Sequence, residues 1–219
     1  MHRIIGKRVV ELPPAGFAEL RAQHSGVLLD VGTGDGKHVL HLARQRPDML
    51  VVGLDASVDA LRKTSAKAAT RADRGGLPNV VFLRAAAERP PEGLVGVDEV
   101  HVLMPWGSLL RGTLGDGTVL EALAAVCAPG APFLVTLNLH AWRPPVAEVG
   151  GRPEPDPESA LTGLRDRYAE AGWQLSEAHY LDDAGIAALA TSWTKRLGSS
   201  RDQLDVLALH GTVHAQMHG

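Results

Sequence analysis

The stretch that decides the fold is VLLDVGTGDGK, residues 27–37 of the 219-residue chain. It begins with an apolar run that is typical of a buried parallel strand. Gly32, Gly34 and Gly36 follow at alternate positions, and residues 37–44 then take up a helical period. Strand, glycine turn and helix predict a nucleotide-binding βα unit. Glycines let the backbone approach a ligand, and a helix N-terminus offers free N–H groups.

An acid in front of the glycines indicates which nucleotide is bound. The dinucleotide fingerprint is G-x-G-x-x-G, whereas this chain has D-x-G-x-G-x-G. Asp30 would repel a pyrophosphate but would attract a cationic amino acid or a sulfonium. A second apolar run, residues 50–55, ends in Asp55, where a carboxylate can accept both ribose hydroxyls. This pair of acids resembles the class I S-adenosylmethionine (SAM)-dependent methyltransferases. The alternatives are a nicotinamide or flavin domain and a glycine turn without a ligand.

Length and composition predict one domain over residues 1–219, because 45% of the residues are apolar and can fill a core. No apolar run approaches the roughly 20 residues that span a bilayer, and residues 1–7 lack a signal-peptide core, so we expect a cytoplasmic enzyme without a membrane partner. The net charge of −3 indicates that any nucleic-acid surface must be local. The single cysteine, Cys127, is expected to pack in the core.

The remaining patterns predict an α/β fold with a doubly wound, mostly parallel seven-stranded sheet, helices on both faces and an antiparallel last strand. Residues 1–24 are expected to form a β-hairpin and a short helix outside this core. Residues 141–157 contain five prolines and predict a proline-rich linker between the fifth and sixth strands. The strands are expected at residues 27–30, 50–55, 79–83, 97–103, 132–139, 173–180 and 203–210.

A basic stripe is expected on the helix predicted for residues 57–74. Lys63, Lys67 and Arg71 recur every four residues, roughly opposite the apolar side. The stripe is either an ordinary solvated face or an RNA contact. No acid interrupts it, and this favours the functional interpretation.

Two tryptophans are expected where a ligand should lie, beyond the carboxyl ends of the strands. Trp106 follows the fourth strand, and Trp193 lies in the connector before the last strand. Residues 84–88, RAAAE, follow the third strand, so the alanines leave room for a purine and Glu88 can accept from an adenine N–H. Trp142 and Trp173 are interpreted as packing residues.

The segments MPWGS, residues 104–108, and TSWTKR, residues 191–196, resemble the aminoglycoside-resistance 16S rRNA (adenine(1408)-N(1))-methyltransferase family. The resemblance covers nearly the whole chain. It implies methyl transfer from SAM to N1 of adenine 1408 in helix 44, within the 30S subunit, by a monomer. S-adenosylhomocysteine would be the other product, and aminoglycoside resistance the consequence.

The resemblance also implies residue roles. Trp106 and Trp193 would clasp a flipped adenine, whose N1 lone pair needs no general base, so that catalysis is mostly alignment. The expected rRNA contacts are Lys63, Lys67, Arg71, Lys195, Arg196 and Arg201. The expected cofactor contacts are Asp30, Gly32, Thr33, Gly34, His38, Asp55, Ala87, Glu88, Val102, Leu103, Met104, Pro105, Trp106, Gly107, Ser108, Thr191 and Ser192.

Other interpretations of the same patterns stay open. The fold would also suit a methyltransferase for another RNA, a small molecule or a protein, or an RNA-binding module with a vestigial cofactor site. No metal is expected, because His38 and His41 lack a third ligand in view and the histidines after residue 209 are interpreted as a solvated tail.

Overall fold

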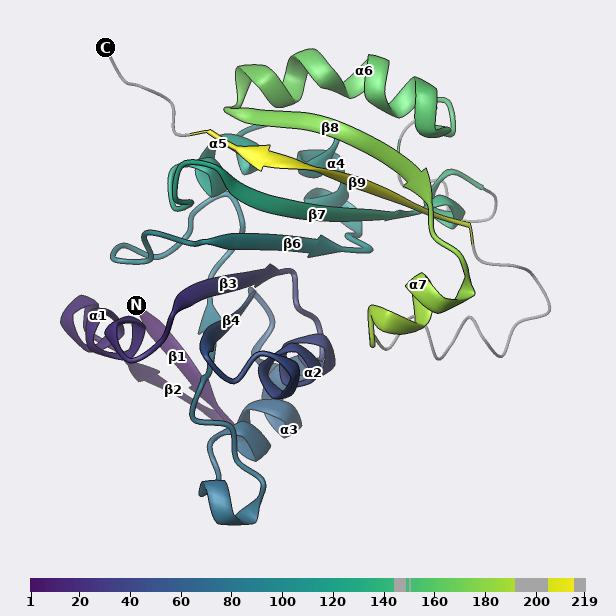
Figure 1. Cartoon of the computed structure of the whole chain (residues 1–219). Coiled ribbons are helices and arrows are strands. Elements are labelled where there is room, and N and C mark those ends of the chain that lie inside the picture. Colours follow the sequence, from purple (N-terminus) through teal and green to yellow (C-terminus); the bar gives the residue numbers. More distant parts are fainter. Residues whose placement is uncertain (144–148, 150, 192–204, 215–219) are drawn as a thin grey trace, which may run out of the picture.

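The computed structural model describes residues 1–143, 149, 151–191 and 205–214 (Figure 1). The strands of these ranges form a single sheet in the order β2-β1-β5-β4-β3-β6-β7-β9-β8. Their bounds are β1 His2–Ile5, β2 Arg8–Glu11, β3 Gly26–Val31, β4 Met49–Asp55, β5 Val80–Arg84, β6 Glu99–Leu103, β7 Ala131–Asn138, β8 Trp173–Tyr180 and β9 Val206–Val213.

Helices connect most of these strands. The bounds are α1 Pro14–Ala22, α2 Lys37–Gln45, α3 Val58–Ala68, α4 Gly107–Thr113, α5 Val119–Ala124, α6 Pro157–Glu170 and α7 Asp183–Ala188, with short 3₁₀ turns at Ala72–Arg74 and Leu139–Trp142. Within the described ranges, none of the helices has both the length and the apolar character needed to cross a bilayer.

The topology confirms the predicted doubly wound sheet. Strands β3 to β7 are parallel, and β9 runs antiparallel between β7 and β8. The chain moves from β3 through β4 to β5 in one direction and then returns to place β6 on the other side of β3. The gap between β3 and β6 is therefore the topological switch point, where open α/β sheets bind ligands.

The N-terminal hairpin is closer to the core than predicted. Strand β1 pairs antiparallel with β5 at Arg3 and Leu83, so the hairpin extends the sheet from seven strands to nine. Ile4 is buried, and the Gly6 N–H donates to Ser65 Oγ on α3 at 2.9 Å. The sequence pattern showed the hairpin but not the edge strand that it covers.

Different helices cover the two faces of the sheet (Figure 1). Phe17 of α1 and Tyr168 of α6 belong to the larger core cluster, whereas α2 and α3 pack over the opposite face. Trp173 is buried in the larger cluster, with its indole N–H donating to Leu120 O at 2.8 Å, which confirms its interpretation as a packing residue. Cys127 is buried there as well.

The prediction of a helix over residues 57–74 is wrong at its C-terminal end, by about a third of its length. Helix α3 ends at Ala68, and Arg71 has extended backbone angles, φ −63° and ψ 148°. The Arg71 guanidinium also lies 3.3 Å from the Asp73 carboxylate. The stripe on α3 therefore reduces to Lys63 and Lys67, which are both exposed.

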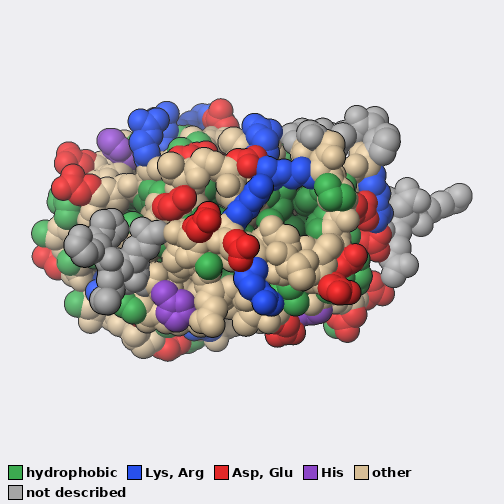
Figure 2. Space-filling view, turned by 90° about the horizontal axis from the view of Figure 1, so that it is seen from above, with side chains coloured by type: hydrophobic (Ala, Val, Ile, Leu, Met, Phe, Trp, Pro, Cys, Tyr) green, Lys and Arg blue, Asp and Glu red, His purple; other side chains and the backbone are tan. Residues whose placement is uncertain are grey.

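Charge is mixed at the far edge of the sheet. Figure 2 views the molecule from above, where α6 and β8 lie, and acidic and basic side chains alternate across this face. An ordinary solvated surface mixes signs in this way.

Candidate cofactor site

The glycine turn after β3 has the predicted shape. Gly32, Gly34 and Gly36 all have positive φ, at 68°, 58° and 71°. A Cβ added at Gly36 would lie 2.7 Å from Phe82 Cε1, whereas at Gly34 the nearest atom would be 4.0 Å away. Gly36 is therefore required for packing, and Gly34 leaves the turn open on the side where a ligand can approach.

Asp55, at the end of β4, is fixed by two backbone donors. The Gly34 N–H donates to Oδ2 at 2.8 Å, and the Ser57 N–H donates to Oδ1 at 2.7 Å. These bonds connect the glycine turn to the start of α3. Each carboxylate oxygen keeps a lone pair that can accept from a ligand hydroxyl.

Asp30 is a buried carboxyl, only 2% exposed, near the end of β3. Burial raises its pKa to about 6, and nearby Asp55 raises it further, whereas the Thr33 hydroxyl and His101 lower it. An ionised carboxylate in such a place is poorly solvated, so a positively charged ligand group beside it would be stabilising.

A cavity of about 290 Å³ opens at the carboxyl ends of these strands, beside the switch point. Among the described residues that line it, two are acids and none is Lys or Arg. The lining residues are Gly32, Leu54, Asp55, Ala56, Ala85, Ala86, Ala87, Glu88, Met104, Pro105, Trp106, Ser108 and Leu109.

The side chains at this cavity suit SAM and disfavour a dinucleotide. Asp55 suits a ribose diol, Glu88 suits an adenine N–H, and the three alanines leave space for a flat ring. Asp30, near the end of β3, suits a cationic amino acid. A pyrophosphate would meet carboxylates here and no basic side chain of the described lining.

Trp106 lies at the same cavity because of the way β6 ends. Met104 has φ 46°, which is uncommon for a residue with a side chain, and its N–H donates to Thr136 O at 2.9 Å and to Thr136 Oγ1 at 3.0 Å. Pro105 follows, and half-buried Trp106 is the N-cap residue of α4. Helix α4 was not predicted, although the leucines at 109 and 110 mark its buried side.

Eight of the predicted cofactor contacts line this cavity, namely Gly32, Asp55, Ala87, Glu88, Met104, Pro105, Trp106 and Ser108. The other described ones are not among its lining residues: Asp30 is near the end of β3, Thr33 and Gly34 belong to the adjoining turn, Val102 and Leu103 are buried in β6, Gly107 begins α4, and Thr191 follows α7. The cavity also has lining residues that were not predicted, namely Leu54, Ala56 and Leu109. Ser192, Trp193, Lys195, Arg196 and Arg201 lie outside the described residues.

The predicted cofactor contact of His38 is not supported. This histidine is 5% exposed, its Nδ1 bonds to Leu189 O at 2.5 Å, and its Nε2 bonds to His101 Nδ1 at 3.2 Å. Both ring nitrogens are thus engaged within the protein. The sequence pattern placed His38 on the first turn of the correct helix but could not show which way it faces.

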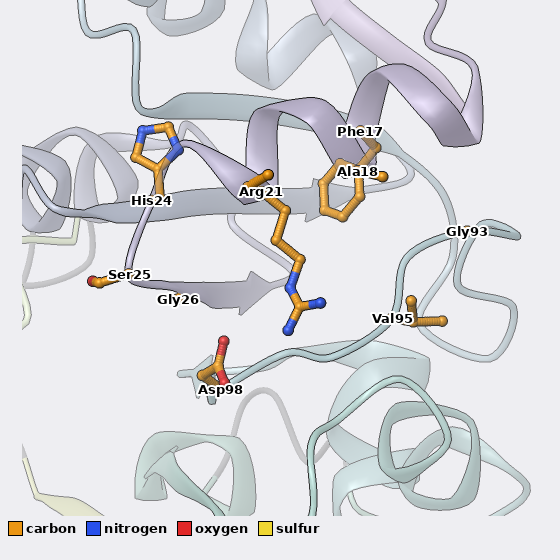
Figure 3. Close-up of a pocket in the computed structure, with 10 residues that line it drawn as sticks. Phe17, Ala18, Arg21, His24, Ser25, Gly26, Gly93, Val95 and Asp98 are labelled. Atoms are coloured by element: carbon orange, nitrogen blue, oxygen red, sulfur yellow. The ribbon is translucent and has the colours of Figure 1, made fainter.

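Two larger cavities lie elsewhere. One of about 330 Å³ sits at the amino end of β3, where Arg21 and Asp98 point toward each other (Figure 3). Another, of about 450 Å³, lies between Trp142, residues 152–156 and α6. Neither includes the glycine turn or the switch point, so the smaller cavity is the candidate site.

Solved structures share this fold at high similarity. The crystal structure of the 16S rRNA methyltransferase KamB has a TM-score of 0.93 and 59% identity, covering 98% of this chain and 100% of that chain. A mutant of the 16S rRNA (adenine(1408)-N(1))-methyltransferase from Catenulisporales acidiphilia, with the cosubstrate SAM, has a TM-score of 0.90 and 36% identity, covering 100% and 99%. The fold and the cavity define a SAM-dependent methyltransferase.

The sequence comparisons narrow this class to one family. The family model described as NpmA, 16S rRNA (adenine(1408)-N(1))-methyltransferase, matches residues 2–212. The protein of that activity from Streptoalloteichus tenebrarius is 59% identical over 214 residues, covering 97% of this chain and 99% of the relative. Its counterpart from Escherichia coli is 30% identical over 203 residues, covering 90% of this chain and 91% of the relative. The chain belongs to the 16S rRNA (adenine(1408)-N(1))-methyltransferase family.

Proposed function

We propose that this protein transfers the methyl group of SAM to N1 of adenine 1408 in helix 44 of 16S rRNA and so confers aminoglycoside resistance. The observation that carries the proposal is the family match over residues 2–212, which includes the glycine turn and both tryptophan segments. The substrate is the 30S subunit, so the reaction takes place in the cytoplasm. The enzyme acts as a monomer.

The cofactor is held by carboxylates of the strand ends. SAM supplies an electrophilic methyl group when it is bound. Asp55 accepts from the ribose hydroxyls, and Glu88 accepts from the adenine edge. Asp30 faces the cationic amino acid. The support for these roles is the acidic lining of the 290 Å³ cavity and the two backbone N–H groups that fix Asp55.

The target base is held by indole rings. A base inside a helix cannot reach the methyl donor, so it is flipped out at a cost of a few kcal/mol. Stacking on Trp106 and Trp193 offsets this cost by about 1–3 kcal/mol for each ring. Adenine N1 presents a lone pair, so the chain's task is alignment rather than proton removal. Trp106 supports this role because it lines the cavity while remaining half-exposed.

Basic side chains position the subunit through its phosphates. Lys63 and Lys67 are exposed on α3, the helix that begins beside Asp55. Lys195, Arg196 and Arg201 complete the surface in our proposal. Arg71 contributes less, because its guanidinium is ion-paired with Asp73. Such contacts fix orientation without reading sequence.

The proposal is tested by primer extension on 16S rRNA from 30S subunits incubated with the purified chain and SAM. We expect a stop at adenine 1408 with the wild-type chain and its absence with Asp55→Ala. Methyl transfer to total RNA or to small molecules, without this stop, would overturn the target assignment and favour another substrate on the same fold.

The docking surface is tested by the paired change Lys63→Glu and Lys67→Glu. Loss of two phosphate contacts should weaken 30S binding and flatten its salt dependence. Arg165→Glu is the matched control for each single lysine reversal, because Arg165 is exposed on α6 at the other end of the sheet (Figure 1). Equal effects of Arg165→Glu and of either single lysine reversal would contradict the α3 surface.

A further inference from the structure

A buried polar chain runs beside the cofactor cavity, and the proposed reaction does not use it. It begins at Leu189 O and passes through His38 to His101, whose Nε2 lies 2.9 Å from Glu99 Oε1. The Arg46 guanidinium then bonds to the other oxygen of Glu99 at 2.5 Å. Both histidines are buried, at 5% and 7% exposure.

The hydrogen bonds fix the protons at the two ends of this chain. A carbonyl oxygen only accepts, so His38 Nδ1 carries a proton and donates to Leu189 O. The ionised Glu99 carboxylate also only accepts, so His101 Nε2 carries a proton and donates to it. Between the two rings, either nitrogen can be the donor.

The surrounding charges agree with this assignment. Burial and the neighbouring His101 lower the pKa of His38 to about 4, and the His101 hydrogen bond lowers the pKa of Glu99 to about 2. Asp30 lies opposite His101 in the β3–β6 register, so a second carboxylate faces the histidine pair. The other groups that act on the pair are His41 of α2, Arg46 after α2 and His210 of β9.

The far end of the chain holds a strained backbone position. Leu189 is the C-cap residue of α7, and Ala190, which follows, has φ 49°. Trp193 is three residues further along the sequence. Leu189 also packs with Leu103 and Met104, the residues that lead to Trp106. The end of α7 is thus tied to the same strand end from which the other tryptophan starts.

We propose that His38 and His101 are positioning residues for methyl transfer, which hold the end of α7 against the strand end that leads to Trp106. The inference rests on the proposed function. His38 is not among the described residues that line the cavity, and it acts through the Leu189 carbonyl.

The first experiment separates kcat from SAM affinity. We expect His38→Leu to lower kcat on 30S subunits by roughly 10- to 100-fold, while SAM affinity by calorimetry stays near the wild-type value. His38→Asn keeps an amide donor toward Leu189 O and should recover part of the loss. Gln45→Leu, exposed at the end of the same helix, is the matched control and should leave kcat unchanged.

The second experiment reads the protons directly, without activity. In ¹⁵N-histidine spectra of the full chain at neutral pH, we expect a proton on His38 Nδ1 and a proton on His101 Nε2. Absence of either proton, or a normal kcat for folded His38→Leu beside an active wild-type chain, would overturn the positioning role. Failure of the wild-type chain to methylate 30S subunits would instead overturn the proposed function.

Discussion

The residues that precede the two tryptophan segments have similar backbone angles but are supported differently. Met104 and Ala190 are the two non-glycine residues with positive φ in the described part of the chain, at 46° and 49°. Each lies two or three residues before a tryptophan. Such backbone costs about 1–3 kcal/mol and persists only where its surroundings enforce it.

The difference lies in what enforces the strain. Met104 is buried and bonds to Thr136 of the neighbouring strand. These partners do not titrate. The residue before Ala190 is held by His38, a buried histidine whose pKa is lowered to about 4 by burial. One approach to a tryptophan segment is therefore permanent, and the other depends on the protonation of a buried side chain.

The largest expected effect comes from removing the indole ring of Trp106, which follows the strained Met104. Trp106→Ala should reduce methyl transfer by up to about 100-fold, because stacking on the flipped base is lost. Trp106→Phe keeps an aromatic face and should retain more activity. The measurement is tritium transfer from labelled SAM to 30S subunits. Near-normal activity of Trp106→Ala would remove this residue from the target site.

Glycine substitutions compare the two strained residues directly. Met104→Gly should lower the free energy of unfolding by about 2 kcal/mol, because loss of a buried side chain outweighs the relief of strain. Ala190→Gly relieves similar strain with little lost packing and should raise it by up to about 1 kcal/mol. Urea unfolding measures both. If Ala190→Gly also lowered the free energy of unfolding, the strain inferred at Ala190 would be contradicted.

Because His38 titrates and holds the end of α7, we expect its protonation to change the free energy of unfolding with pH. The folded pKa of His38, about 4, lies below its ordinary value, so its contribution to stability is lost as pH falls from about 6 to about 4.5. The folded pKa of Asp30, about 6, lies above its ordinary value, so its contribution grows over the same interval. Each amounts to about 1.5 kcal/mol, and the two nearly cancel.

The opposite pH-dependent contributions of His38 and Asp30 should become visible when one of the two side chains is replaced. Relative to the wild-type chain, unfolding measured across the interval should show His38→Leu gaining stability as pH falls and Asp30→Asn losing it. Parallel pH profiles for all three chains would mean that neither group titrates with the shifted pKa.

The smallest expected effect comes from the hydrogen bond that Thr136 accepts from the Met104 N–H. Thr136→Val removes the hydroxyl acceptor for the Met104 N–H but leaves the Thr136 carbonyl bond, so unfolding should become easier by about 1 kcal/mol. Because the partner does not titrate, the change should be equal at pH 6 and pH 4.5. If thermal unfolding showed a loss of stability that differs between the two pH values, the support of Met104 would not be independent of pH as we infer.

The sequence was sufficient for features that depend on local spacing. The turn after Asp30, the strand-end position of Asp55 and the place of Trp106 follow from apolar runs and glycines, and the structure has them where they were expected. The His38 contact joins residues 151 positions apart, which no local pattern encodes. The end of α3 was missed for a different reason. Thr70 Oγ1 bonds back to Lys67 O, and the chain turns before Arg71.

The buried Cys127 has a practical consequence for labelling. It is the only cysteine of the chain, and burial raises the pKa of its thiol to about 12. Thiolates, rather than thiols, react with maleimides, so the native side chain should stay unmodified at neutral pH. Tyr180 is 51% exposed at the end of β8, close to α7. Tyr180→Cys would give a single fluorophore attachment point for following α7 as the enzyme meets the ribosome.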